Sequence, residues 1–343
     1  MEYSGKYSIF NSNTIKTYPL RTRQNKVKKD QLIFPEQIKQ WNLSLSEHIT
    51  SKINLLAKSV VDCRQTNKPV VLFSGAHLIK SGMGPLIIDL AKHQLLTLVA
   101  GNGATAIHDF ELALIGETSE YVPDALGKGQ FGMAYEFAYI NEALSLGNKY
   151  KLGYGELLGK MICDAGFRSD ILWEVVRDSS PGNFSCREIS VLAACYENSV
   201  PFTVHAGIGV DVIDQHPSFD GQAKGGCSGR DFLIFTNEIC KFTNGGVVIN
   251  IGSAVQGPEV LLKAISMAAN AGNTPHDILT ADFDLRNYDS EKMTDESFHG
   301  YYFRDQKSIV TRIPLAFNGN GLYIQGDIKQ TVPLLYKTIM ELI

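Results

Sequence analysis

Apolar positions recur along the chain at two spacings, one typical of helices and one of buried strands. Short apolar runs rich in β-branched residues predict strands at 69–74, 95–100, 201–205, 246–251, 278–283, 308–313 and 321–325. Apolar residues at helical spacing predict helices at 44–66, 83–92, 105–115, 130–176, 187–196, 230–242, 258–269 and 331–339, the last with Pro333 in its first turn.

These elements alternate from residue 35 onward, with loops expected at 116–130, 215–230 and 285–300. A strand followed by a helix and another strand is the unit from which parallel sheets are built. The pattern therefore predicts an α/β fold, a large doubly wound and mostly parallel sheet with helices on both faces. We expect a single domain of this kind over residues 35–343, preceded by a separate N-terminal arm over residues 1–34.

The N-terminal arm differs from the rest of the chain in charge. Residues 1–34 hold seven basic and two acidic side chains, with a local run RTRQNKVKKDQ. We interpret this segment as a solvated arm or as a strap that crosses a neighbouring subunit. A nucleic-acid arm would also be basic, but no aromatic or repeated residues accompany this run.

Composition narrows the class of protein. The chain has 343 residues, 44% of them hydrophobic, and a net charge of −4, which favours a globular protein over a nucleic-acid scaffold. No apolar stretch reaches the roughly 20 residues of a membrane-spanning helix, and the first residues do not resemble a secretion signal. The six cysteines form no C-x-x-C pair and are read as reduced thiols. We expect a cytoplasmic protein with no membrane or nucleic-acid partner.

Four predicted strands end in small residues. Small residues let a ligand approach the backbone, and ligands of open parallel sheets bind at the carboxyl ends of the strands. No G-x-G-x-x-G or P-loop motif is present, and tight packing of helix on strand is the alternative explanation. We expect a nucleotide-sized cofactor site at Ser74, Gly75, Ala76, Gly101, Asn102, Gly103, Ala104, Thr105, Gly252 and Ser253.

A histidine and two acids follow the second of these glycine-rich turns. His108 is a candidate ribose ligand or acid–base group, because imidazole titrates near neutral pH. Glu111 lies three residues later, so the two side chains can share a helix face. Asp109 is a candidate cofactor ligand, although an acid in a first turn also serves to cap a helix.

A second polar segment contains His205, Asp211, Asp214 and His216. This is the composition of a metal site, but the spacing fits no standard metal signature. We therefore expect no metal, and assign Asp214 and His205 to the substrate pocket. A metal-dependent hydrolase built on these four residues is the alternative that we rank last.

Several segments resemble deoxyhypusine synthase. SGAHLIKSGMGPLIIDLAKHQLLTLVAGNGATAIHDF is similar to the stretch in which that family binds NAD, and CREISVLAACYENSVPFTVHAGIGVDVID resembles the helix and strand that lead to its aspartate, here Asp214. GGVVINIGSAVQGPEVLLKAI and LYIQGDIKQTVPLLYKTI resemble later strand and helix pairs, with Asp327 at the family's acid. The resemblance covers roughly residues 65–340.

The resemblance implies a homotetrameric, NAD-dependent transferase that oxidises a polyamine and passes the resulting group through an imine on a lysine. The sequence departs from the family in four places: His108 replaces an acid, Gly75-Ala76-His77 replaces Thr-Ser-Asn, Pro258-Glu259 falls at the histidine pair, and Trp-x-Lys has no counterpart. Lys307 is the lysine nearest to the position of the family's Trp-x-Lys. The neighbouring basic residue Arg312 cannot form an imine, because it stays protonated at neutral pH.

We therefore expect transient oxidation of an amine to an imine, with His108, Asp214 and Lys307 as catalytic residues. Glu259, Asp214 and His205 are expected to hold the substrate ammonium, and Asp109 and Asp327 to contact NAD. A weaker resemblance, to the NAD-dependent ornithine cyclodeaminase domain, gives an ammonia lyase as the alternative. A non-catalytic nucleotide-binding oligomer is the second alternative.

Overall fold

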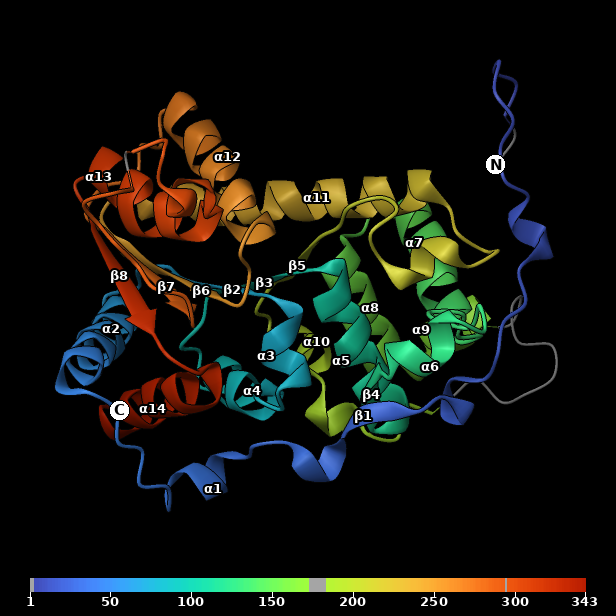
Figure 1. Cartoon of the computed structure of the whole chain (residues 1–343), viewed down its shortest axis with the longest axis horizontal. Coiled ribbons are helices and arrows are strands. Elements are labelled where there is room, and N and C mark those ends of the chain that lie inside the picture. The colour runs from blue at the N-terminus through green and yellow to red at the C-terminus, as the bar shows by residue number, and fades with distance from the viewer. Residues whose placement is uncertain (1–2, 173–182, 294) are drawn as a thin grey trace.

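The computed structural model describes residues 3–172, 183–293 and 295–343, and it is built on one parallel sheet (Figure 1). Six strands lie in the order β5-β3-β2-β6-β7-β8, and every neighbouring pair is parallel. The strands are β2 (Val70–Ser74), β3 (Leu98–Asn102), β5 (Phe202–His205), β6 (Gly246–Ile251), β7 (Ile278–Asp284) and β8 (Asn320–Gln325). Six of the seven predicted strands are thus confirmed.

The strand order identifies the kind of sheet. Counted from β2, the order is 3-2-1-4-5-6, which is the order of doubly wound dinucleotide-binding folds. After β5 the chain returns to the other side of β2 and continues outward through β6, β7 and β8. The carboxyl ends of β2 and β6 therefore flank the point where the winding reverses, and the predicted fold class is confirmed.

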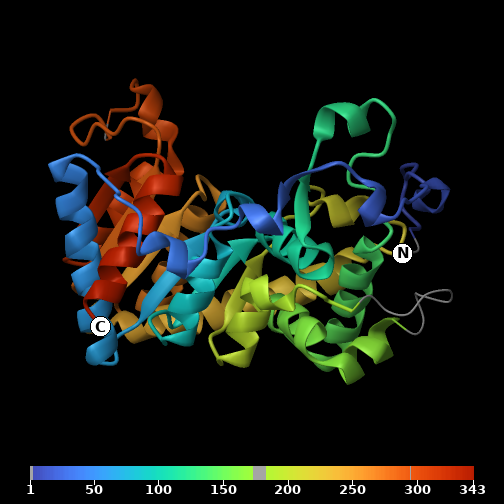
Figure 2. The same ribbon diagram turned by 90° about the horizontal axis from the view of Figure 1, so that it is seen from below.

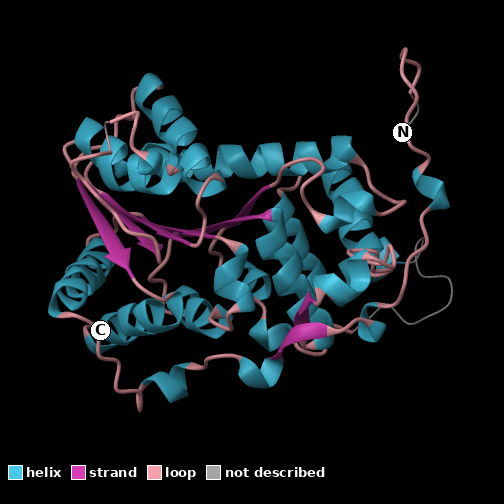
Figure 3. Ribbon diagram, in the orientation of Figure 1, coloured by secondary structure: helices cyan, strands magenta, loops and turns pink. Residues whose placement is uncertain are grey.

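Helices cover both faces of the sheet, as Figures 1 and 3 show. One face packs on α2 (Glu47–Gln65), α4 (Gly84–Lys92) and α14 (Ile328–Glu341), and the other on α11 (Gly221–Ile239) and α12 (Gln256–Asn270). In β2, Val70 and Leu72 belong to the first core while Val71 and Phe73 belong to the second. Both faces of this central strand are buried because alternate side chains point to opposite sides, which explains its continuous apolar run.

The shorter elements extend the molecule beyond β5 and connect the layers (Figure 1). β1 (Asn25–Lys28) pairs antiparallel with β4 (Glu117–Glu120) in a separate ribbon. The remaining helices are α1 (Pro35–Ile38), α3 (Ala76–Lys80), α5 (Gly103–Ile115), α6 (Val122–Leu126), α7 (Phe137–Tyr150), α8 (Tyr154–Cys163), α9 (Ala165–Leu172), α10 (Val191–Glu197) and α13 (Ile313–Ala316). Positions 173–176 of the long helical prediction lie outside the described residues. Within the described part of the chain, no helix is long and apolar enough to cross a membrane.

Four local predictions are wrong. The run at 308–313 is not a strand but part of a π-helical segment, Gln306–Arg312, which packs on β7 and β8. Residues 221–229 are not a loop, because Asp220 caps α11 and Gly226 permits close contact with Asn148 of α7. The predicted loop at 116–130 contains β4 and α6. Pro333 is inside α14 rather than in its first turn, because that helix begins at Ile328.

The N-terminal segment runs along the outside of the molecule (Figure 2). Leu20 and Leu32 are buried in the main core, and Arg23 pairs with Glu111 at 2.7 Å. The stretch from Leu20 to Leu32 therefore packs on its own chain and is not a solvated arm. The first part of the segment leaves large apolar side chains in solvent, with Tyr7 and Phe10 both 74% exposed.

Candidate functional site

A pocket of about 320 Å³ opens at the carboxyl edge of the sheet, beside the point where the winding reverses. The turn after β6 and the ends of β7 and β8 form its walls, together with α3. The lining residues are His77, Ser81, Gly252, Ser253, Ala254, Phe283, Asp284, Leu285, Arg286, Asp305, Asp327 and Ile328. Three residues predicted as cofactor ligands, Gly252, Ser253 and Asp327, are brought together here.

The turns after β2 and β6 meet at the inner end of this pocket. The backbone N–H of Gly75 donates to the carbonyl of Ile251 at 2.8 Å. A Cβ on Gly75 would lie 1.9 Å from the carbonyl oxygen of Gly252, so no other residue fits there without a backbone shift. Gly252 has φ +69°, a conformation that favours glycine. Contact between the two turns thus accounts for both glycines.

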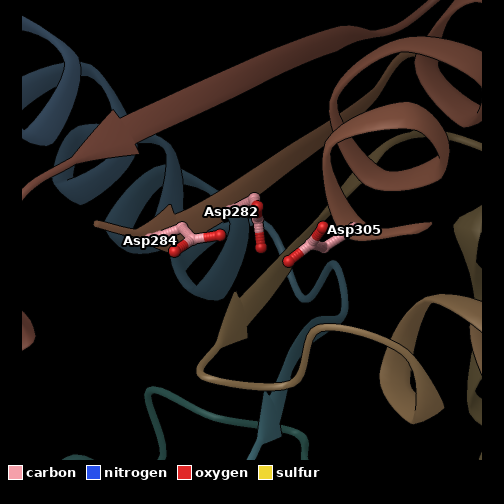
Figure 4. A group of neighbouring side chains, drawn as sticks. All are labelled: Asp282, Asp284 and Asp305. Atoms are coloured by element: carbon pink, nitrogen blue, oxygen red, sulfur yellow. The ribbon is translucent and has the colours of Figure 1, made fainter. Parts of the chain in front are cut away.

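Three aspartates converge at one side of the pocket (Figure 4). Asp282 and Asp284 come from the end of β7, and Asp305 precedes the π-helical segment. One oxygen from each carboxylate lies within 4.8 Å of the others. The guanidinium of Arg286 hydrogen-bonds to both Asp284 and Asp305, and so bridges the two carboxylates that line the pocket.

Asp282 is the buried member of this group, at 1% exposure. Its Oδ1 accepts a hydrogen bond from Asn250 Nδ2 at 2.7 Å, but its Oδ2 has no hydrogen-bond partner among the described residues. Burial, and secondly the carboxylate of Asp305, raise the pKa of Asp282 well above its usual value. The side chain therefore holds a proton readily when no cation is close to it.

His77, on α3, supplies a titratable group in the pocket lining. Burial lowers the pKa of His77, and the nearby positive charge of Lys80 and the ring of His108 lower it further. The imidazole is therefore neutral at pH 7 and can accept a proton. The pocket thus combines an uncharged base with several carboxylates.

The small residues at the start of α5 serve packing inside the chain. Asn102 caps this helix through the N–H of Thr105, and the Thr105 hydroxyl donates to the carbonyl of Ser74 at 3.1 Å. A Cβ on Gly101 would lie 2.9 Å from Thr105, and one on Gly103 would lie 2.0 Å from a carboxylate oxygen of Asp211. The packing alternative therefore explains these glycines. Neither they nor Ser74, Ala76 and Ala104 line the pocket.

Asp109 is committed to another helix. It is buried, and its carboxylate accepts hydrogen bonds from the Ser190 hydroxyl at 2.5 Å and from the backbone N–H groups of Val191 and Leu192. Burial raises the pKa of Asp109 to about 6, although these hydrogen bonds oppose the rise. Asp109 thus holds the start of α10, and it contributes nothing to the pocket lining.

His108 belongs to a network that joins α5 to the N-terminal segment. Its Nδ1 lies 2.7 Å from the Thr118 hydroxyl, which itself hydrogen-bonds to Glu111. Glu111 in turn accepts from Arg23 at 2.7 Å. Every member of this network has a partner in the structure, so a role in fixing β1 and β4 against α5 accounts for it.

Asp214 is neutralised by a lysine that sequence reasoning missed. The Nζ of Lys224, which has no exposed side-chain surface, donates to Asp214 at 2.5 Å, to Asp211 at 2.8 Å and to the Gly207 carbonyl at 2.8 Å. The second oxygen of Asp214 accepts from the N–H of Gly209. This buried cluster closes the loop after β5 against the start of α5.

The other expected substrate and nucleophile residues are also outside the pocket. Lys307, the expected nucleophile, is buried with its ammonium over the Tyr301 ring. Glu259 lies on α12, where it pairs with Lys263 and, at 3.5 Å, with Arg304. The structure therefore brings none of His108, Asp214 and Lys307 together with another of the three.

His205 and His216, the two histidines of the segment that was considered as a metal site, lie in different surroundings. His205 stacks on Phe73 at 5.5 Å, and burial lowers its pKa to about 3. His216 pairs through Nδ1 with Ser218 at 2.8 Å, and burial lowers its pKa to about 4. His205 lines a different pocket, with Lys224 and Gln256, at the end of β5.

Sequence reasoning missed His77, Asp282, Asp284, Arg286 and Asp305. The missed signal was the run ADFDLR at the end of the strand predicted at 278–283, where acids rather than small residues stand at the carboxyl end of the strand. Parallel strands bring their carboxyl ends to one edge, so acids at a strand end belong in the same search.

No model of a known protein family matches the chain, and no curated protein sequence matches it. Among solved structures, the apo arginine dihydrolase ArgZ of the cyanobacterial ornithine-ammonia cycle has 14% identity and a TM-score of 0.48, over 87% of this chain and 32% of that one. The ternary complex of AgrE with ornithine and NAD+ has 13% identity and a TM-score of 0.47, over 88% and 34%.

A deoxyhypusine synthase candidate from Entamoeba histolytica has 8% identity and a TM-score of 0.41, over 95% of this chain and 97% of that one. The coverage figures for ArgZ and AgrE show that this chain spans about a third of the length of those two chains. At these identities and scores the likeness transfers no activity.

Proposed function

We propose that the protein is an NAD-dependent enzyme that transiently oxidises a small cationic amine in the pocket at the carboxyl edge of the sheet. The observation that carries the proposal is the position of an acidic pocket beside the winding reversal of a 3-2-1-4-5-6 sheet. Ligands of such sheets bind at this point, and carboxylates in a pocket favour a cationic ligand.

The pocket residues fit some parts of NAD better than others. Carboxylates such as Asp284 can accept hydrogen bonds from ribose hydroxyls, and Ser81 and His77 offer further polar contacts. The acidic lining opposes the two charges of a pyrophosphate, so we expect the phosphates to lie toward the backbone of the Gly252 turn. NAD, when bound, supplies a hydride acceptor that turns the carbon–nitrogen bond of an amine into an imine.

The chain itself supplies charge recognition and a base. Asp327 caps α14 with Oδ1, and its side chain lies at the exposed rim of the pocket, where it can bind the substrate ammonium. His77, neutral at pH 7, can take the proton that the ammonium must lose before its carbon is oxidised.

The lining also bears on which reaction follows oxidation. None of the described residues that line the pocket is a lysine, and Lys307 is buried under Tyr301. A transferase that passes a group through a lysine imine needs such a residue in reach of the substrate. We therefore favour the cyclodeaminase-like alternative over polyamine transfer. In it a second amine of the same substrate attacks the imine carbon, the carbon–nitrogen bond to the first nitrogen breaks with loss of ammonia, and the hydride returns to the resulting cyclic imine.

Incubation of the purified protein with NAD and a panel of ornithine, diamines and polyamines should release ammonia from at least one substrate. Native mass spectrometry should show bound NAD. His77→Gln should lower turnover by about 10²–10⁴-fold, the usual contribution of a general base. His276→Gln, at an exposed histidine outside the pocket, should leave turnover unchanged.

Borohydride trapping separates the alternatives. A substrate adduct on a lysine would contradict the ammonia-lyase assignment and restore the transferase. Absence of ammonia, NADH and any adduct across the whole panel would contradict the enzyme proposal and leave a nucleotide-binding protein.

A further inference from the structure

We propose that Asp282, Asp284 and Asp305 form a site for a hard divalent cation such as calcium at the floor of the pocket. The first observation is the convergence of one oxygen from each side chain within 4.8 Å. The second is Asp282 Oδ2, which is buried and has no hydrogen-bond partner among the described residues. The side chain of Asp282 lies between those of Asp284 and Asp305 (Figure 4).

Charge balance favours a divalent ion. The three carboxylates carry three negative charges when ionised, and Arg286, which bridges two of them, carries one positive charge. When all three carboxylates are ionised, the cluster is therefore left with two uncompensated negative charges, one of them on a side chain that is 1% exposed. Buried charges are costly unless they are paired or bind a metal, and one divalent cation supplies the missing charge.

The number of carboxylates favours calcium over magnesium. Calcium takes about 6–8 oxygen ligands in flexible geometry, whereas magnesium demands near-ideal octahedral geometry and is usually bound through only one or two carboxylates. The cluster offers one oxygen from each of three carboxylates, and water can reach it from the pocket. This ligand set suits calcium better than magnesium.

The surroundings can complete the coordination shell. Asp284 and Asp305 line the pocket, so water can reach the ion from the open side. Arg286 contacts the Oδ2 atoms of Asp284 and Asp305, and each carboxylate oxygen can accept a second partner. Asp282 Oδ2 then provides the inner ligand for which the protein offers no donor.

This inference goes beyond the proposed function, because it requires neither NAD nor an amine. A bound cation would neutralise the floor of the pocket and weaken its repulsion of an anionic cofactor. Asp327, which is outside the cluster, would remain available to the ammonium.

The test is a titration of the full chain, freed of metal by chelation, with CaCl2, MgCl2 and TbCl3 in the absence of NAD and amine. Tyr323 and Tyr288 stack 4.9 Å apart beside the cluster and can sensitise terbium luminescence. We expect one terbium per chain, displaced by Ca2+ at lower concentration than by Mg2+. Ca2+ should also raise the melting temperature.

Asp282→Asn should abolish saturable binding while the chain stays folded, because the amide can donate to the neighbouring carboxylates. If Asp282→Asn fails to fold, Asp305→Asn removes a different ligand of the site and should also abolish saturable binding. Asp295→Asn, at an exposed aspartate outside the cluster, should bind as the wild type does.

Two results would overturn the site. One is the absence of saturable binding of any of the three ions at millimolar concentration. The other is equal binding by Asp282→Asn and the wild type. A higher melting temperature of Asp282→Asn without any metal response would show that a proton, not a cation, resides between these carboxylates. If no ion binds but ammonia is still released in the presence of chelator, the cation site fails while the proposed function stands.

Discussion

Replacement of Lys224 by methionine is expected to destabilise the protein by about 3–5 kcal/mol, the usual cost of removing one partner of a buried ion pair. The variant keeps the length of the side chain but leaves Asp211 and Asp214 facing each other without a cation. Both carboxylates are almost buried, at 5% side-chain exposure. Urea unfolding at pH 7 measures the change in the free energy of unfolding.

The loss should shrink as the pH falls. Burial raises the pKa of Asp211, and Lys224 opposes that rise, so removal of the lysine raises the pKa further. Protonation of Asp211 at acid pH then removes its repulsion of Asp214 in the variant, so the loss of stability is smaller there. Lys241→Met is the matched control, because Lys241 is exposed beside Glu238 and should cost less than about 1 kcal/mol. Equal losses in the two variants would show that the buried cluster contributes little.

The fold could be predicted because the strands of a parallel sheet are apolar on both faces. GVVINI at 246–251 coincides with β6 residue for residue. The run at 308–313 misled because Ile309 and Val310 are equally apolar in a buried helix, and a short apolar run does not distinguish the two. Gly321 on β8 permits the π-helical segment to pack closely on the sheet, since a Cβ there would lie 1.9 Å from the carbonyl oxygen of Val310.

The candidate site was predictable only as an edge of the sheet. The sequence pointed to the carboxyl ends of the strands and to Gly252, Ser253 and Asp327, which line the pocket; their role as cofactor ligands stays a prediction. It could not show that Asp211 faces the start of α5, or that Lys224 lies under the same loop, because those contacts depend on how a loop folds back over the sheet. Spacing along the chain carries no information about such contacts.

Replacement of Asp231 by asparagine should change how stability depends on pH. Asp231 Oδ2 accepts from the N–H groups of Val204 at 2.6 Å and Gly155 at 2.9 Å, and so joins β5 to α8. Its Oδ1 is buried without a hydrogen-bond partner among the described residues, and burial raises the pKa of Asp231 to about 7. The folded state therefore binds this proton more tightly than the unfolded state.

The sign of the effect follows from that difference. Because the folded pKa is raised from 3.8 to about 7, the contribution of Asp231 to stability is lost as the pH rises through this window. Asparagine does not ionise and can still accept both backbone hydrogen bonds. The free energy of unfolding of the variant, relative to the wild type, should therefore increase by about 2–3 kcal/mol between pH 5 and pH 7, at about 1.4 kcal/mol per pH unit.

Urea unfolding of both proteins at pH 5, 6 and 7 gives this difference directly. His205 and His216, whose lowered pKa values act in the opposite direction, titrate in both proteins and cancel, as does Asp109. Asp170→Asn, at an exposed aspartate of α9, should run parallel to the wild type. If Asp231→Asn also ran parallel to the wild type, Asp231 would be ionised in the folded protein throughout this range. The hydrogen bonds from Val204 and Gly155 would then outweigh the cost of its burial.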